Sequence, residues 1–259
     1  MIRRFFSQAY LYFKAQQAAF RFEEFICFEA GYPLITLIFY CLLAAYSFNT
    51  ANLTHWVVGN SFLLCVNTCI FTLGNTFTGE RYYGRIRSIV VAPTSKLALV
   101  LQRGLFPALV AVGTVIAGFL AGSLIFGVDF TGINLGLFAL IVFAAMFAAT
   151  GFGLLLSVFG LISDSMHFVL NLASNVLLIF CGANFPVSQL GIWGNISWVL
   201  PLTRTIKAAD MLFGVVDGAK LVSLLAGELA IGAAYFVAAA LVIRIVERAA
   251  RRRATLEVF

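Results

Sequence analysis

Long apolar stretches separated by short polar connections make up most of the chain. A window of about 19 residues finds six of them, near residues 25–47, 56–78, 97–126, 134–160, 168–184 and 221–244. A helix needs about 20 apolar residues to cross a hydrocarbon core of roughly 30 Å. The alternating ten-residue segments of a membrane barrel are missing, so helices must bond the backbone amides that lipid cannot. The pattern predicts an all-α integral membrane fold with six transmembrane helices spread over residues 25–247.

Two segments are amphipathic or broken rather than continuously apolar. Residues 1–24 repeat large apolar side chains at steps of three and four, which predicts an interfacial helix lying in the headgroup layer. Residues 185–215 contain Pro186, Pro201, Trp193 and Trp198. This segment is too polar to cross a bilayer and too aromatic for a free loop. We expect this region to form re-entrant helices in the outer leaflet.

A third exception is the charged segment between the second and third spans. Helical spacing groups Tyr82, Ile86 and Ile89 on one side of residues 79–93, and Pro93 ends the helix. The segment is therefore expected to be a short amphipathic helix on the membrane surface. From spacing alone it is either a solvated loop whose bases set topology or a docking helix for a partner.

Composition agrees with a multi-pass membrane protein. Apolar residues make up 62% of the 259 positions and charged residues only 11%, whereas soluble domains are nearer half apolar and a quarter charged. The net charge of +6 does not indicate nucleic-acid binding, because the bases sit at the ends of apolar segments rather than on one polar face. The five cysteines lie in apolar segments without a CxxC pair, so no metal site is expected.

The basic residues also predict sidedness. Fourteen of the seventeen Lys and Arg residues fall on the side of the N-terminus, the second loop and the basic tail at 248–259. Arg204, Lys207 and Lys220 fall on the other side. The positive-inside rule then places both termini in the cytoplasm of a plasma or inner membrane.

Four motifs in order resemble those of the ABC-2 type exporter permeases. The first is Glu80, Arg81 and Gly84 followed by an apolar patch and Pro93. The others are Gly153 to Ser157 in the fourth span, Asn184 to Pro186 after the fifth, and Leu200 to Gly214. The resemblance covers roughly residues 20–245. One departure is Arg85-Ile86-Arg87, where the family more often has a small residue and an acid.

The resemblance implies a dimer of permease protomers driven by two copies of a separate ABC ATPase subunit. No Lys in the chain follows a Gly, so the GxxxxGK[ST] phosphate cradle is not present in these residues. We therefore expect no catalysis and no bound cofactor here, with ATP and Mg held by the partner subunit. The residues expected to contact the ATPase are Glu80, Arg81, Tyr82, Tyr83, Gly84, Arg85 and Arg87, with Ser163, Asp164 and His167 as a lesser contact.

Polar stripes inside the second and fifth spans are the candidate substrate path. They contain Asn60, Asn67 and Asn75, and Asn171 and Asn175. Such amides either join helices by hydrogen bonds or line the path. In the resembling family the first, second and fifth spans line the central interface, which would add the aromatic residues Phe28, Tyr32, Phe39, Tyr40, Phe62 and Phe180.

An aromatic wall with a few amides suits a small hydrophobic or amphipathic substrate better than an ion. A drug, antibiotic or peptide is the expected cargo, and a lipid-linked glycan is the alternative. Isolated ionisable residues such as Glu228 do not make the clustered charges of an ion-coupled carrier or channel. An ion-coupled carrier or channel and a membrane-embedded enzyme are the rival hypotheses.

Overall fold

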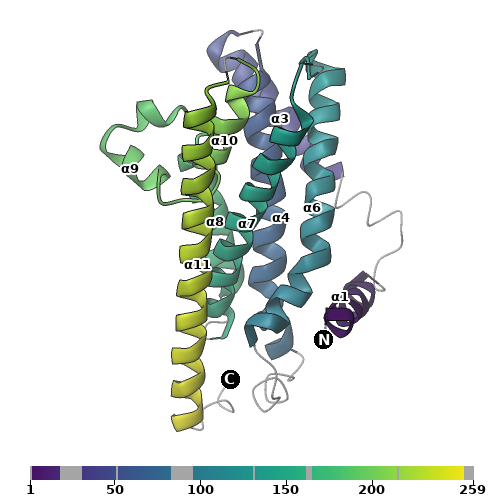
Figure 1. Cartoon of the computed structure of the whole chain (residues 1–259), viewed down its shortest axis with the longest axis vertical. Helices are drawn as coiled ribbons and strands as arrows, with labels where there is room; N and C mark the ends of the chain where they lie inside the picture. Colours follow the sequence, from purple (N-terminus) through teal and green to yellow (C-terminus); the bar gives the residue numbers. More distant parts are fainter. Residues whose placement is uncertain are drawn as a thin grey trace.

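The computed structural model describes residues 2–17, 31–50, 52–82, 96–130, 132–161, 165–214 and 216–253. Within these ranges the regular structure is helical throughout, without strands, and the all-α prediction is confirmed there. Figure 1 shows an elongated bundle of long helices. In chain order the elements are α1 (Ile2–Gln17), α3 (Tyr32–Phe48), α4 (Thr54–Tyr82), α6 (Lys96–Phe126), α7 (Leu135–Ser157), η2 (Val158–Leu161), α8 (Met166–Phe180), η3 (Val187–Trp193), α9 (Gly194–Ser197), α10 (Thr203–Met211) and α11 (Gly218–Arg253).

Four helices are long and apolar enough to cross a membrane, with spans at Thr54–Gly74, Ala108–Phe126, Leu135–Gly160 and Gly218–Ile245. They correspond to the expected second, third, fourth and sixth spans. The expected first and fifth spans appear as shorter apolar helices, Pro33–Phe48 and Met166–Phe180. The chain is thus a multi-pass membrane protein. That α3 and α8 also cross the membrane, which would make six crossings, stays a prediction.

The bundle is organised around α4, which packs against α3, α6, α7 and α8. Helix α11 lies on the other side of α7 and makes its main contacts there. Figure 1 shows α1 and the C-terminal end of α11 at one end of the bundle, while α10 lies toward the other. Helix α1 and the C-terminal end of α11 therefore lie toward the same end of the bundle.

Small residues let α6 approach α4 closely. A Cβ at Gly118 would lie 2.5 Å from Ser61 Oγ, and one at Gly122 would lie 2.3 Å from Val57 Cγ1. Glycines spaced four apart commonly serve this purpose in membrane helices, where tight packing replaces the hydrophobic effect. Next to this contact Phe119 packs edge to face on Phe138, with ring centroids 5.0 Å apart.

Local side-chain bonds mark where several helices begin. The Asn134 side chain accepts hydrogen bonds from Gly136 N and Leu137 N at the start of α7. The Asp217 carboxylate accepts from Ala219 N and Lys220 N at the start of α11. Both side chains satisfy backbone N–H groups that have no partner inside the helix.

Helix α1 lies against the outside of α6. Tyr10 and Phe13 place their rings 5.8 Å and 5.5 Å from that of Phe106, and Gln102 donates to Gln8 at 3.1 Å. Large exposed side chains on α1 include Phe6 and Leu11. The predicted amphipathic helix is therefore present over Ile2–Gln17, and residues 18–24 of that prediction lie outside the described residues.

Two element boundaries differ from the sequence expectation. Helix α4 continues through Tyr82, so Glu80 to Tyr82 extend the span instead of starting a separate surface helix. Helix α11 runs to Arg253, so the expected tail at 248–259 is helical for its first six residues. The broken region at 185–215 contains three short helices, η3, α9 and α10.

Candidate functional site

Four of the expected ATPase-coupling residues lie in the described part of the chain, where α4 ends and α8 begins. Glu80, Arg81 and Tyr82 form the last residues of α4, with side chains that the structure does not describe. His167 is exposed in the first turn of α8. Figure 1 places this end with α1 and the basic end of α11. The other expected contacts lie outside the described residues: Tyr83, Gly84, Arg85, Arg87, Ser163 and Asp164.

Amides on α8 point away from the protomer. Asn171 and Asn175 are both exposed, on the same helical face as the exposed apolar residues Phe168, Leu172 and Ile179. Asn171 Nδ2 donates to the carbonyl of His167 at 2.8 Å, which leaves its amide oxygen available. Exposed amides in the middle of an otherwise apolar helix would be costly against lipid.

The amides on α4 have a different environment. Asn60 is fully buried, and its Nδ2 donates to Asn184 Oδ1 at 2.9 Å and to the carbonyl of Trp56 at 2.9 Å. Asn67 is half-buried, and its buried amide oxygen has no hydrogen-bond partner among the described residues. The side chain of Asn75 is not described. Asn60 therefore joins elements within the protomer through its Nδ2, while its Oδ1, like that of Asn67, has no hydrogen-bond partner among the described residues.

Some of the aromatic residues expected along the path are exposed, and others are buried. Phe39 is 58% exposed on α3, and its ring lies 5.5 Å from that of Tyr40. Phe180 is half-buried at the end of α8. Phe62 is buried in the core, in contact with the Phe119 ring. Phe28 and the side chain of Tyr32 lie outside what the structure describes.

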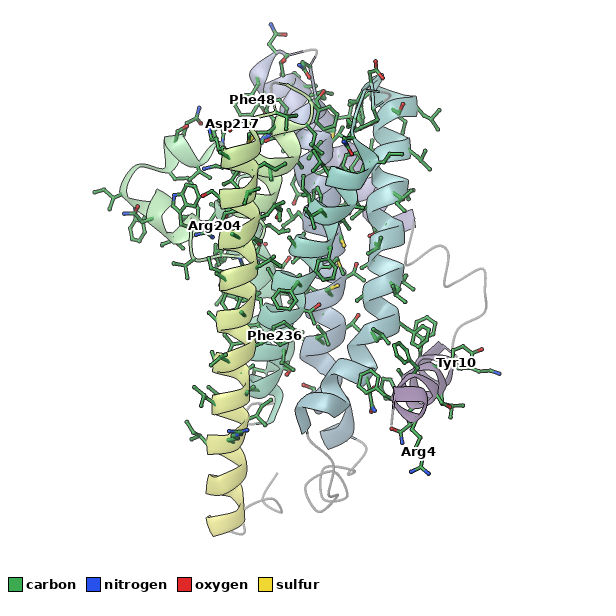
Figure 2. The ribbon with its side chains drawn as sticks, viewed as in Figure 1. Arg4, Tyr10, Phe48, Arg204, Asp217 and Phe236 are labelled. Carbon is green, nitrogen blue, oxygen red and sulfur yellow. The ribbon has the colours of Figure 1, made fainter. Side chains whose placement is uncertain are left out.

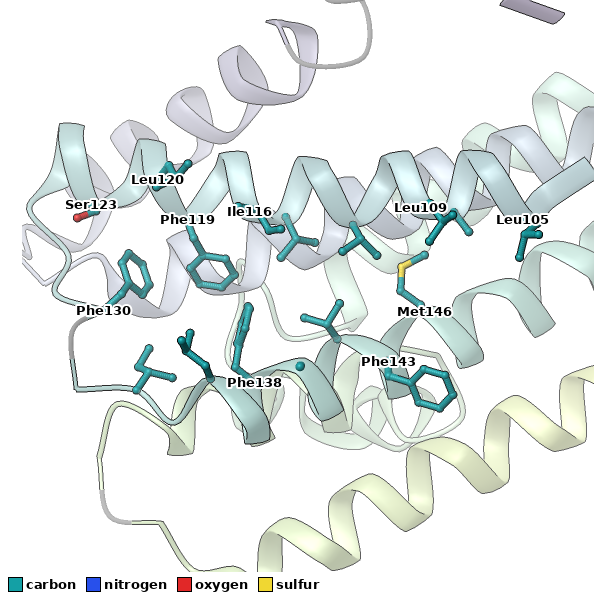
Figure 3. A pocket seen from close by; sticks show the side chains of 17 residues that line it. Leu105, Leu109, Ile116, Phe119, Leu120, Ser123, Phe130, Phe138, Phe143 and Met146 are labelled. Atoms are coloured by element: carbon teal, nitrogen blue, oxygen red, sulfur yellow. The ribbon is translucent and has the colours of Figure 1, made fainter. Parts of the chain in front are cut away.

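An apolar groove of about 780 Å³ separates parts of α6 and α7. Figure 3 shows Ile116, Phe119, Phe138 and Met146 lining it from the two facing helices. Ser123, at one end, is the one polar side chain in its lining. Such a groove can accept a hydrocarbon chain but has almost no groups to orient a polar ligand.

Sequence reasoning missed a buried polar connection between α10 and α11. Glu228 is fully buried, and its Oε1 accepts a hydrogen bond of 2.7 Å from Leu202 N, just before α10. Leu202 has a φ of 80°, in the left-handed region that a leucine rarely adopts. Glu228 looked isolated in the sequence because its partner is a backbone group 26 residues away.

A second missed contact joins α4 to α10. His55 Nδ1 lies 2.7 Å from Asp210 Oδ2. Both side chains are about one third exposed. This pair and the Asn60–Asn184 bond fasten the start of α4 to Asn184, directly before the broken region 185–215, and to α10 inside it. No local sequence pattern could have predicted either contact, because each joins residues more than 120 positions apart.

Two cations on α10 also have defined neighbours. Arg204 Cζ and Lys207 Nζ lie over the ring of Trp198, 5.2 Å and 4.1 Å from its centroid. The sequence suggested only a topological role for these bases. Their position over one indole ring shows that they form a local cluster as well. Within the described residues, groups of three or more His, Cys, Asp or Glu able to hold a metal ion are absent.

The sequence matches the model of a membrane-protein family described as ABC-2 type transporter, over residues 11–213. No curated protein shows a significant match. The matched segment includes α3 to α10 and, except for Gly214, every motif on which the resemblance was based. Because the match extends over most of the chain and agrees with the helical membrane bundle, the chain belongs to the ABC-2 type transporter family.

Proposed function

We propose that this chain is the permease subunit of an ATP-driven exporter that works as a homodimer with two separate ATPase subunits. Membership of the family makes it a transmembrane subunit of an ABC transporter and implies an ATPase partner in general. The direction of transport, the copy numbers and the cargo are our proposal. The cargo is a small hydrophobic or amphipathic compound, carried out of the cytoplasm or the inner leaflet.

The exposed face of α8 is the observation that carries the proposal. Asn171 and Asn175 lie there between Phe168 and Ile179, where a single protomer leaves them uncovered. Lipid is a poor neighbour for amide groups. A second protomer, with a substrate path between the two, would cover them and leave their hydrogen-bonding groups for an amphipathic molecule.

Helix α4 offers a route for force between the coupling end and this face. It is continuous over 29 residues, which corresponds to about 43 Å at 1.5 Å per residue. Its last turn carries Glu80 and Arg81, and the helix packs against α8. A push on that turn by an ATPase would therefore move a rigid rod in the centre of the bundle rather than a loose loop.

Cysteine cross-linking in membranes tests the dimer. In a background without native cysteines, Asn175→Cys should form a covalent dimer with a short cross-linker. The matched control is Val237→Cys, on the exposed face of α11, 60% exposed and away from α8. Efficient dimers from the control and none from Asn175→Cys would contradict the proposed interface.

A deletion strain tests the cargo. We expect altered resistance to members of a panel of hydrophobic drugs, antibiotics and peptides, restored by the wild-type gene. Loss of a surface glycan with unchanged resistance would instead identify the alternative cargo, a lipid-linked glycan. Substrate accumulation that follows an ion gradient and ignores ATP would support the rival carrier class.

A further inference from the structure

Three cations gather where α10 meets α11. Arg204 and Lys207 on α10 lie over the Trp198 ring at 5.2 Å and 4.1 Å, and Lys220 stands near Lys207 at the start of α11. Figure 2 shows Arg204 beside α11, on the side of the projecting α9 region. The electron-rich face of an indole attracts cations and holds them in place. The two α10 cations therefore have a defined position.

The carboxylates described nearby make no direct ion pair with these cations. Asp210 pairs with His55, and Asp217 accepts from the first backbone N–H groups of α11. Glu228 accepts from Leu202 N through Oε1, its Oε2 has no hydrogen-bond partner, and it makes no ion pair within 4.0 Å among the described residues. None of the three neutralises the cations by direct contact.

Arg204 and Lys207 both lie in surroundings that would stabilise an anion. Arg204 Nη1 is buried and has no hydrogen-bond partner among the described residues. Burial, together with the positive charges of Lys220 and Arg204, lowers the pKa of Lys207. An anion placed between the two side chains would pair with the guanidinium and relieve the repulsion.

The cluster lies close to the edge of the hydrocarbon layer. The span Gly218–Ile245 is 28 residues long, about 42 Å at 1.5 Å per residue, whereas roughly 30 Å is needed. Arg244 is exposed at its far end and marks the opposite interface. Twenty residues counted back from there put the nearer edge at about residue 224. A Cβ at Gly227 would lie 2.9 Å from Arg204 Cδ, so the arginine packs on α11 just inside this edge.

Exposed apolar side chains adjoin the cations. Ile192, Trp193 and Val199 are 90%, 67% and 63% exposed on the projecting region. The Tyr235 hydroxyl on α11 donates to the carbonyl of Val199 and holds this region against the bundle. Cations at headgroup depth beside an exposed apolar surface match both parts of a lipid with an anionic headgroup.

We propose that Arg204 and Lys207, positioned over Trp198, bind the phosphate headgroup of an anionic membrane phospholipid, whose chains lie along the apolar surface of η3 and α9. The site is distinct from the transport path on α8. It therefore does not depend on the identity of the cargo or on the dimer proposed above.

Native mass spectrometry of the full-length protein in detergent tests the site directly. Phosphatidylglycerol and phosphatidylcholine of the same chain length are titrated separately, and retained lipid is counted. We expect phosphatidylglycerol to bind more tightly, and the double variant Arg204→Gln with Lys207→Gln to lose about tenfold or more in affinity for it. Phosphatidylcholine binding should not change.

A charge-neutral variant separates a defined site from general attraction. Gly227→Ala keeps all charges but pushes the Arg204 side chain off α11, so it should also weaken phosphatidylglycerol binding. The control Arg244→Gln removes one positive charge at the other end of α11 and should leave it unchanged. Equal loss in the control, unchanged binding in the double variant, or displacement of the lipid by equimolar inorganic phosphate would overturn the proposal.

Discussion

The Glu228 carboxylate on α11 accepts a 2.7 Å hydrogen bond from the backbone N–H of Leu202, the residue that precedes α10. Leu202 provides no side-chain cap for this helix. The acceptor for its own backbone N–H is a buried acid on another helix. The Leu202 side chain is itself fully buried. Burial of that side chain and the bond from Glu228 together offset a backbone conformation that costs of the order of 1–3 kcal/mol.

Removing the Glu228 carboxylate should destabilise the protein. We expect Glu228→Ala to cost about 1–3 kcal/mol, because it leaves a buried N–H without an acceptor. Glu228→Gln keeps a carbonyl oxygen at the same position and should retain most of the stability. Unfolding by sodium dodecyl sulfate, followed by circular dichroism, measures both variants. If Glu228→Ala is as stable as the wild-type protein, the hydrogen bond does not contribute to stability.

Close packing of α6 on α4 gives a second prediction. Gly122→Ala places a methyl group 2.3 Å from Val57 Cγ1 and should destabilise by about 1–3 kcal/mol. Gly113→Ala on the same helix meets no atom within 4 Å. It should be neutral or raise stability by up to about 1 kcal/mol through helix propensity. The same unfolding assay compares the two, and equal effects would contradict the packing argument.

The Asn60–Asn184 bond should couple α4 to the turn after α8. In a double-mutant cycle of Asn60→Ala and Asn184→Ala, the coupling should be favourable by about 0.6 kcal/mol, within a ceiling near 1.7 kcal/mol. Strictly additive effects on unfolding would mean that the 2.9 Å contact contributes no stability. If Asn60→Ala loses transport while its stability is unchanged, Asn60 would instead belong to the substrate path.

Charge reversal tests the coupling segment. Arg85→Glu with Arg87→Glu should weaken association with the ATPase by about tenfold or more, since paired interface charges set register and specificity. The matched control, Arg251→Glu with Arg252→Glu, makes the same change in charge at the end of α11. Co-purification of the ATPase measures the effect. If the ATPase still co-purifies with the first double variant but not with the second, the contact lies at the end of α11 instead.

The sequence predicts the helices well because hydrophobic length and spacing are local properties. The expected spans 56–78, 97–126 and 221–244 correspond to α4, α6 and α11 within a few residues at most ends. The larger errors lie where a helix continues into polar sequence. Neither Glu80 nor Arg248 stops its helix, because charged residues with good helix propensity extend it beyond the bilayer.

The polar contacts of the candidate sites were beyond sequence reasoning for a different reason. His55 meets Asp210 and Asn60 meets Asn184 only after the whole bundle has assembled. The same applies to Arg204, whose place is set by Trp198 and by a gap above Gly227. The exposed amides of α8 were predictable as a stripe, but their direction depends on which face of α8 packs on α4.

The central claim is that this chain moves its substrate with work supplied by a separate ATPase. Reconstitution into vesicles, with and without the cognate ATPase subunit and with and without ATP, tests it most directly. We predict ATP-dependent substrate movement only when both polypeptides are present, and its loss when Arg85→Glu and Arg87→Glu are combined. Full transport by this chain alone in the absence of nucleotide would contradict the account.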